Sequence, residues 1–250
     1  RVNDLGIAGL ILGLTPLVGR HGAELGAILL YPALLFAGAI FLSARIGRRL
    51  WGREAGPVAA VLTALAFPGT TVFIPGRIDH HALQVVLIQG FVLLLMRAPD
   101  LRGGLAAGAI AGLGLIVGLE TVPQIAMLSA ALCLGWVVGG TGERARLGGF
   151  ALALAGVTLV FFVLLRPSFW PTELCDAFTP ASVHAALAVA GALGALAAAT
   201  PRLRDWRWRL GAGALIGGAV LGATLYAYPG CAAGPYGAMD PFLRTFFLPH

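Results

Sequence analysis

The chain has 250 residues, of which 58% are hydrophobic and 11% are charged, and its mean hydropathy is +0.88. Soluble domains have roughly 45–50% apolar and about 25% charged residues, so this balance excludes an ordinary soluble fold. The net charge of +6 does not indicate nucleic-acid binding, because the charges form short clusters between apolar runs rather than one basic face.

Long runs of Ala, Leu, Val and Gly without two-residue alternation predict transmembrane helices rather than barrel strands. Residues 5–19 are fewer than the roughly 20 that cross a bilayer, and they include Pro16, which predicts a short interfacial helix. The remaining apolar runs predict about eight spanning helices in one all-α, polytopic bundle, a single membrane-embedded domain over residues 1–250. These runs are residues 25–44, 58–74, 82–96, 105–119, 122–138, 150–165, 181–199 and 210–228.

The arginines predict the orientation of this bundle. All 17 basic residues are Arg, and 12 of them fall in the connections that alternation places on one side. An excess of positive charge marks the cytoplasmic side, so the opposite face, which carries most of the acids, is expected to hold the functional site. The Ala, Gly, Arg and Leu bias is typical of a GC-rich bacterial genome, which predicts the bacterial inner membrane, with the site on the periplasmic side.

Small residues and cysteines add two further expectations. The glycine-rich runs 103–118 and 211–222 predict close helix packing. Cys133 is expected inside a span, whereas Cys175 and Cys231 are both expected outside, which makes them candidates for a disulfide. Cα atoms more than about 7 Å apart would exclude that bond.

Residues 76–81, with the sequence Gly-Arg-Ile-Asp-His-His, are the most chemically distinctive segment. Asp79 and His81 are candidate ligands of a divalent cation, provided that the backbone between them is not regular helix. Alternatively, Asp79 caps the next helix and the histidines face the membrane interface. Arg77 is a candidate for binding a phosphate, with an ordinary interfacial arginine as the alternative.

Glu120 is a second candidate, because it ends an apolar run and a carboxylate near a membrane is costly. We expect it to line a donor or acceptor cavity. Solvation at the interface, or a helix cap, is the alternative.

The stretch Phe73-Ile-Pro-Gly-Arg-Ile-Asp-His-His-Ala-Leu-Gln84 resembles the second outer-loop motif of the catalytic subunit of oligosaccharyltransferases, membrane enzymes of the GT-C glycosyltransferase fold. Residues 1–4 resemble the tail of their first outer loop. Residues 234–237, followed by Asp240-Pro241, resemble the approach to a large outer loop. The specific motif covers only the first of these stretches.

The resemblance implies a GT-C-like bundle that transfers a sugar or oligosaccharide from a polyprenyl-phosphate-linked donor to an acceptor on the outer face. It also implies that Asp79 and His81 bind Mn or Mg, and that the metal neutralises the phosphate leaving group. The family's first acidic motif and its glutamate motif are not among these 250 residues. We therefore expect a fragment truncated at both ends, with weak or no metal binding and no activity by itself.

A secondary transporter, with Asp79 and Glu120 as ion or proton sites, is the main alternative from another functional class. A structural membrane subunit is a third. The concentration of polar residues at one surface favours the enzyme, because transporter sites lie near the bilayer midplane.

Overall fold

The computed structural model describes residues 2–165, 175, 177–234, 240 and 242, and within them every element is a helix. The chain divides into two compact units, residues 1–98 and 99–250. Among the described residues, five helices are long and apolar enough to cross a membrane. Several such helices indicate a membrane protein, as the composition predicts.

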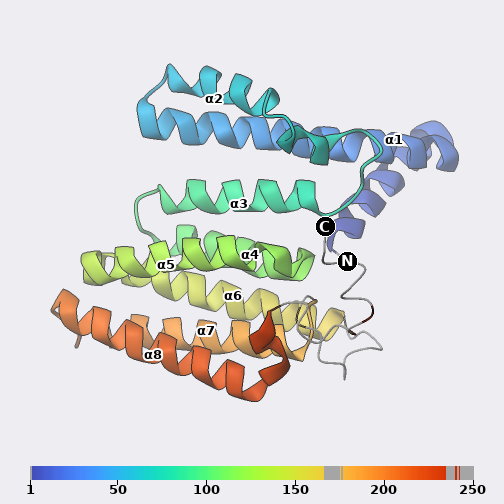
Figure 1. Cartoon of the computed structure of the whole chain (residues 1–250). Helices are drawn as coiled ribbons and strands as arrows, with labels where there is room; N and C mark the ends of the chain where they lie inside the picture. The colour runs from blue at the N-terminus through green and yellow to red at the C-terminus, as the bar shows by residue number, and fades with distance from the viewer. Residues whose placement is uncertain (1, 166–174, 176, 235–239, 241, 243–250) are drawn as a thin grey trace. The chain divides into compact units, whose positions relative to one another are not determined.

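The first unit consists of α1 (Val2–Trp51), α2 (Ala55–Ala64), the short 3-10 helix η1 (Gly69–Phe73) and α3 (His81–Leu95). Figure 1 shows α2 lying alongside α1. At Gly19 the φ angle is 70° and the ψ angle 170°, so α1 is two helices joined at a break. The expected end of the short first helix at residue 19 is confirmed.

The expectation of a continuous helix over residues 58–74 is wrong. α2 has 10 residues, about 15 Å of helix, which is too short to cross a hydrocarbon core of about 30 Å. Pro68 explains the break, because proline lacks the donor N–H of a helix interior and disfavours helical backbone in the residue before it. η1 follows instead, and it brings the chain to the loop before α3.

The second unit consists of α4 (Leu101–Val117), η2 (Leu119–Thr121), α5 (Val122–Gly139), η3 (Gly140–Gly142), α6 (Arg144–Leu164), α7 (Pro180–Ala199), α8 (Trp206–Ala227) and η4 (Pro229–Ala233). The five α-helices lie side by side with similar axes (Figure 1). Their bounds match the predicted runs to within a few residues. With α3 at 15 residues and α4 at 17, however, the expected count of about eight spans is not confirmed.

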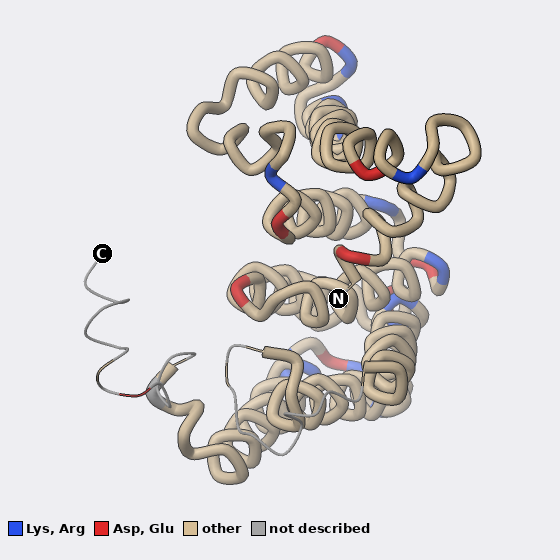
Figure 2. Tube along the Cα trace, turned by 90° about the vertical axis from the view of Figure 1, so that its right-hand side faces the viewer, with Lys and Arg blue, Asp and Glu red and all other residues tan. Residues whose placement is uncertain are grey.

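Charged side chains lie near helix ends, at the Gly19 break or in connections, and the helices of both units are largely uncharged along their length (Figure 2). In the first unit Arg49 donates to the carbonyl of Met96 at 2.7 Å, so the end of α1 and the end of α3 are neighbours. In the second unit Arg144 donates to the carbonyl of Ala197 at 3.1 Å, and the start of α6 meets the end of α7. Each unit therefore has one end at which arginines gather. This is expected when successive helices run in opposite directions and the arginine-bearing connections lie on the same side.

Glycines on α4 bring its backbone against α6. A Cβ added at Gly104 would lie 2.1 Å from the carbonyl oxygen of Arg146, and one at Gly108 would lie 2.2 Å from that of Phe150. Close packing through the first glycine-rich run is thus confirmed. The second run differs, because a Cβ at Gly211, Gly217, Gly218 or Gly222 would have no neighbour within 4 Å.

The Gly108→Ala variant should be less stable than the wild type by about 1–3 kcal/mol, because the α6 backbone must move to accept the methyl group. Thermal unfolding in detergent, followed by circular dichroism, measures the change. Gly156→Ala on α6 is the matched control, since a Cβ there has no neighbour within 4 Å. It should leave stability unchanged or raise it by up to about 1 kcal/mol. Equal effects of the two substitutions would contradict this view of the α4–α6 contact.

A disulfide joins Cys175 and Cys231, with the Cα atoms 5.4 Å apart and a sequence separation of 56. Constraining a loop of that length is worth up to about 4 kcal/mol through the entropy of the unfolded chain. Cys175→Ser, or reduction of the wild type, should therefore lower the melting temperature, and a reductant should not affect the variant further. Cys133→Ala, which removes the unpaired cysteine, is the control.

Candidate functional site

The loop before α3 is held by hydrogen bonds to α1. The backbone N–H of Gly76 donates to the carbonyl of Ile28 at 3.2 Å, and the side-chain amide of Asn3 donates to the carbonyl of Ile78 at 2.9 Å. Gly76 has a φ of 92°, a backbone conformation that favours glycine. These contacts fix the loop on both sides of Arg77.

Asn3 is the anchor that the sequence alone does not reveal. Its side chain is 4% exposed, and its carbonyl oxygen accepts a hydrogen bond of 2.8 Å from the hydroxyl of Tyr31. Asn3 therefore uses its amide both as donor and as acceptor, and it links two points of α1 to Ile78. A lone asparagine in the first turn of an apolar helix is the only sequence signal for this role.

The Asp79 carboxylate is contacted by the Arg77 side chain, by the backbone N–H of His81 and by the His81 ring. Arg77 Nε donates to Oδ2 at 2.5 Å, and the backbone N–H of His81 donates to Oδ1 at 3.1 Å. The second bond satisfies a donor at the start of α3, as the capping alternative predicts, although the N-cap residue itself is His80. Arg77 is thus paired with the carboxylate, and its binding of a phosphate stays a prediction.

The structure also brings Asp79 and His81 together. Regular helix begins at His81, which leaves Asp79 outside it, and His81 Nδ1 lies 3.2 Å from Asp79 Oδ1. Two ligand atoms that each lie about 2.1 Å from an octahedral cation are separated by about 3 Å. His81 Nδ1 is buried, and Asp79 Oδ1 is the polar atom that it faces, although the pair does not form a well-aligned hydrogen bond. A nitrogen and a carboxylate oxygen at this separation fit a shared cation.

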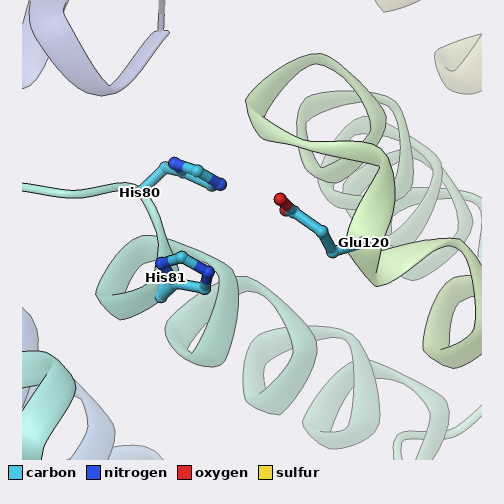
Figure 3. A group of neighbouring side chains, drawn as sticks. All are labelled: His80, His81 and Glu120. Atoms are coloured by element: carbon cyan, nitrogen blue, oxygen red, sulfur yellow. The ribbon is translucent and has the colours of Figure 1, made fainter. Parts of the chain in front are cut away.

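His80 precedes the helix, and its ring is stacked on that of His81 with centroids 4.5 Å apart. Figure 3 shows both rings, His80 on the loop and His81 in the first turn of α3. The pair thus presents two imidazoles next to Asp79, although the resemblance implies a metal-binding role for His81 only.

The charge of Asp79 follows from these contacts. Burial raises the pKa of the Asp79 carboxyl, but the Arg77 side chain and the backbone N–H and ring of His81 outweigh that effect and hold the pKa below its ordinary value. Asp79 is therefore an ionised acceptor at neutral pH. The neighbouring Arg77 opposes a bare cation and favours an anion such as a phosphate.

Glu120 belongs to the second unit, where it is exposed in η2 and leads into α5. Figure 3 draws its side chain on this turn. Asp79 and His81 belong to the first unit, so joint action of Glu120 with these two residues stays a prediction. Residues 235–237, part of the third stretch that resembles oligosaccharyltransferases, lie outside the described residues.

Asn3→Ala should release the loop, because it leaves the Tyr31 hydroxyl and the Ile78 carbonyl without their partners, at a cost of about 1–3 kcal/mol for a buried group. Hydrogen exchange of the amides of residues 76–81 should accelerate more in Asn3→Ala than in Tyr31→Phe, which keeps the bond to Ile78. Thr63→Ala removes a hydroxyl bonded only within its own helix and serves as the control. Unchanged exchange in Asn3→Ala would contradict the anchoring role.

Asp79→Asn should be less stable than the wild type at neutral pH, and the difference should vanish in acid. Because the folded-state pKa of Asp79 is depressed, its stabilisation is present above the ordinary carboxyl pKa of about 3.9 and is lost as the pH falls through the folded value. Melting temperatures between about pH 7 and pH 3 test the sign. Glu54→Gln is the control, since Glu54 makes no side-chain capping bond. A difference that persists undiminished in acid would contradict the assignment.

Comparison with known proteins gives no further assignment: no family model matches the chain, and no match is found among curated proteins or solved structures.

Proposed function

We propose that the chain belongs to a membrane glycosyltransferase that takes a sugar or oligosaccharide from a polyprenyl-phosphate-linked donor. The observation that carries the proposal is the pairing of the buried His81 Nδ1 with Asp79 Oδ1 at 3.2 Å, with Arg77 on the same carboxylate. A cation held by Asp79 and His81 would lie beside the guanidinium of Arg77. Both are positively charged, and this arrangement suits a phosphate that contacts the cation and the guanidinium together.

Asp79 and His81 would hold a divalent cation, Mn or Mg. When bound, such an ion neutralises charge on a phosphate leaving group. Asp79 is kept ionised for this task by its neighbours, and His81 is kept in place by the first turn of α3. Arg77 would orient the phosphate, and Asn3 would hold the loop against α1 through its hydrogen bond to the Ile78 carbonyl.

The position of these residues suits a donor with a lipid tail. They lie at the start of α3, whereas five of the eight arginines of the first unit gather near the end of α1 and the end of α3. An interfacial site lets the tail stay in hydrocarbon while the charged head meets polar side chains. We place this site on the periplasmic face, following the distribution of the arginines.

The transporter alternative draws less support from the same contacts. Transporter sites near the midplane use broken helices and unwound backbone. Asp79 instead lies in a loop at a helix end, and Glu120 lies in a short turn at another.

Asp79→Ala and His81→Ala should each lower sugar transfer from a short-chain polyprenyl-pyrophosphate-linked sugar by at least about 100-fold, because even outer partners of metal ligands are worth about 10–100-fold. Transfer is measured in membranes that contain equal amounts of the full-length enzyme that the resemblance implies, because the chain by itself is expected to be inactive. Mn²⁺ binding, followed by electron paramagnetic resonance, should be weak in the chain and lost in both variants. His21→Ala, an exposed histidine on α1, is the control.

Full transfer by Asp79→Ala would contradict the proposed enzyme. Glu120→Gln tests the remaining member of the predicted set. It should lower transfer while leaving the melting temperature unchanged, whereas a change in stability without a change in transfer would assign Glu120 a structural role.

A further inference from the structure

Helix α8 is attached to the second unit at both of its ends. Near its start, the Arg209 guanidinium donates to the carbonyls of Val137 and Arg204 at 2.7 and 2.8 Å, and Arg209 is 7% exposed. Just past its end, the Tyr228 hydroxyl is hydrogen-bonded to His184 of α7, and Cys231 forms the disulfide with Cys175. The helix is thus fixed at two points separated by its whole length.

Between these two points α8 packs only loosely against α7 and α5. Arg209 is its one buried residue in the described chain. Two cavities, of about 300 and 650 Å³, separate it from α5 and α7, and they share lining residues on all three helices. The shared residues are Val122, Ala126, Ala185, Val189 and Thr224. We call the combined space the α8 slot.

The slot is as long as the hydrocarbon core of a membrane is thick. Its lining on α8 and just beyond runs from Leu210 to Tyr228. At about 1.5 Å per residue this distance is about 27 Å, against about 30 Å for a bilayer core. None of the lining residues is charged.

Most of the few hydroxyls on its walls are bonded locally. Ser182 Oγ donates to the carbonyl of Thr179 at 2.9 Å, and Thr224 Oγ1 donates to that of Val220 at 2.8 Å. Water in a cavity needs two to four polar partners, which these walls do not offer. The volumes of the two cavities, about 300 and 650 Å³, are typical of a ligand-binding site rather than of a packing defect.

We propose that the α8 slot holds one hydrocarbon chain of a bilayer phospholipid. The three helices that form the slot all lie in segments long and apolar enough to cross a membrane, so hydrocarbon is the medium that surrounds them. An empty slot would cost its walls their dispersion contacts, and α8 cannot collapse onto α5 and α7 while both ends are tied. A single chain restores those contacts along the full length. The inference goes beyond the proposed sugar transfer and does not depend on it.

Trp136 provides the test, because it lines the slot and its side chain is 1% exposed. In a reporter protein the other tryptophans are replaced: Trp51→Phe, Trp170→Phe, Trp206→Phe and Trp208→Phe. The reporter is placed in nanodiscs of phosphatidylcholine with either brominated or unmodified acyl chains. Bromine quenches tryptophan at contact, so the fluorescence of Trp136 should fall with the brominated lipid.

Filling the slot should abolish that quenching. Ala130→Phe fills it from α5, and Gly217→Leu fills it from α8, so the test survives if one variant fails to fold. Ala188→Phe, on an exposed position of α7 that does not line the slot, is the matched control and should keep the quenching. Circular dichroism confirms that each variant is folded.

Three results would overturn the proposal. They are the absence of quenching in the unfilled reporter, equal quenching in filled and unfilled proteins, and quenching that requires added polyprenyl phosphate. The last outcome would assign the slot to a polyprenyl tail instead of a phospholipid chain.

Discussion

The need to satisfy every backbone N–H and C=O group without water determines the architecture of this chain. With 58% hydrophobic residues, most of its length faces lipid or other helices, and helices satisfy the backbone internally. Polar side chains are therefore found at helix ends and breaks, where the backbone itself has unsatisfied groups. The candidate site and the arginine-rich ends are both consequences of this constraint.

The same physics gives Asp79 two roles. Its carboxylate accepts from the His81 N–H and from Arg77, which satisfies a helix start and keeps the carboxylate charged. A group placed for helix capping is thereby also placed beside the buried His81 Nδ1. The capping and ligand interpretations of the segment are compatible, because they use the carboxylate at the same position.

The second unit combines tight and loose packing in one set of helices. Glycines 104 and 108 bring α4 into backbone contact with α6, which gives that pair dispersion contacts that longer side chains would prevent. α8 lacks such contacts and depends on Arg209 at one end and on the disulfide at the other. A helix tied in this way can border a space for lipid without losing its position.

The sequence by itself determined the helical class, the membrane character and most helix bounds, because hydrophobic runs and glycine or proline breaks act locally. It also marked Asp79 and His81, although it left capping and metal binding as alternatives. Only the tertiary structure decided that residues 58–74 are a ten-residue helix followed by η1, and that Cys175 and Cys231 are bonded. It alone revealed Asn3 and Tyr31 as supports of the loop, and showed that four of the five glycines of α8, unlike those of α4, have no neighbour within 4 Å of an added Cβ. These features depend on which distant segments meet, and that depends on how whole helices pack rather than on any local pattern of residues.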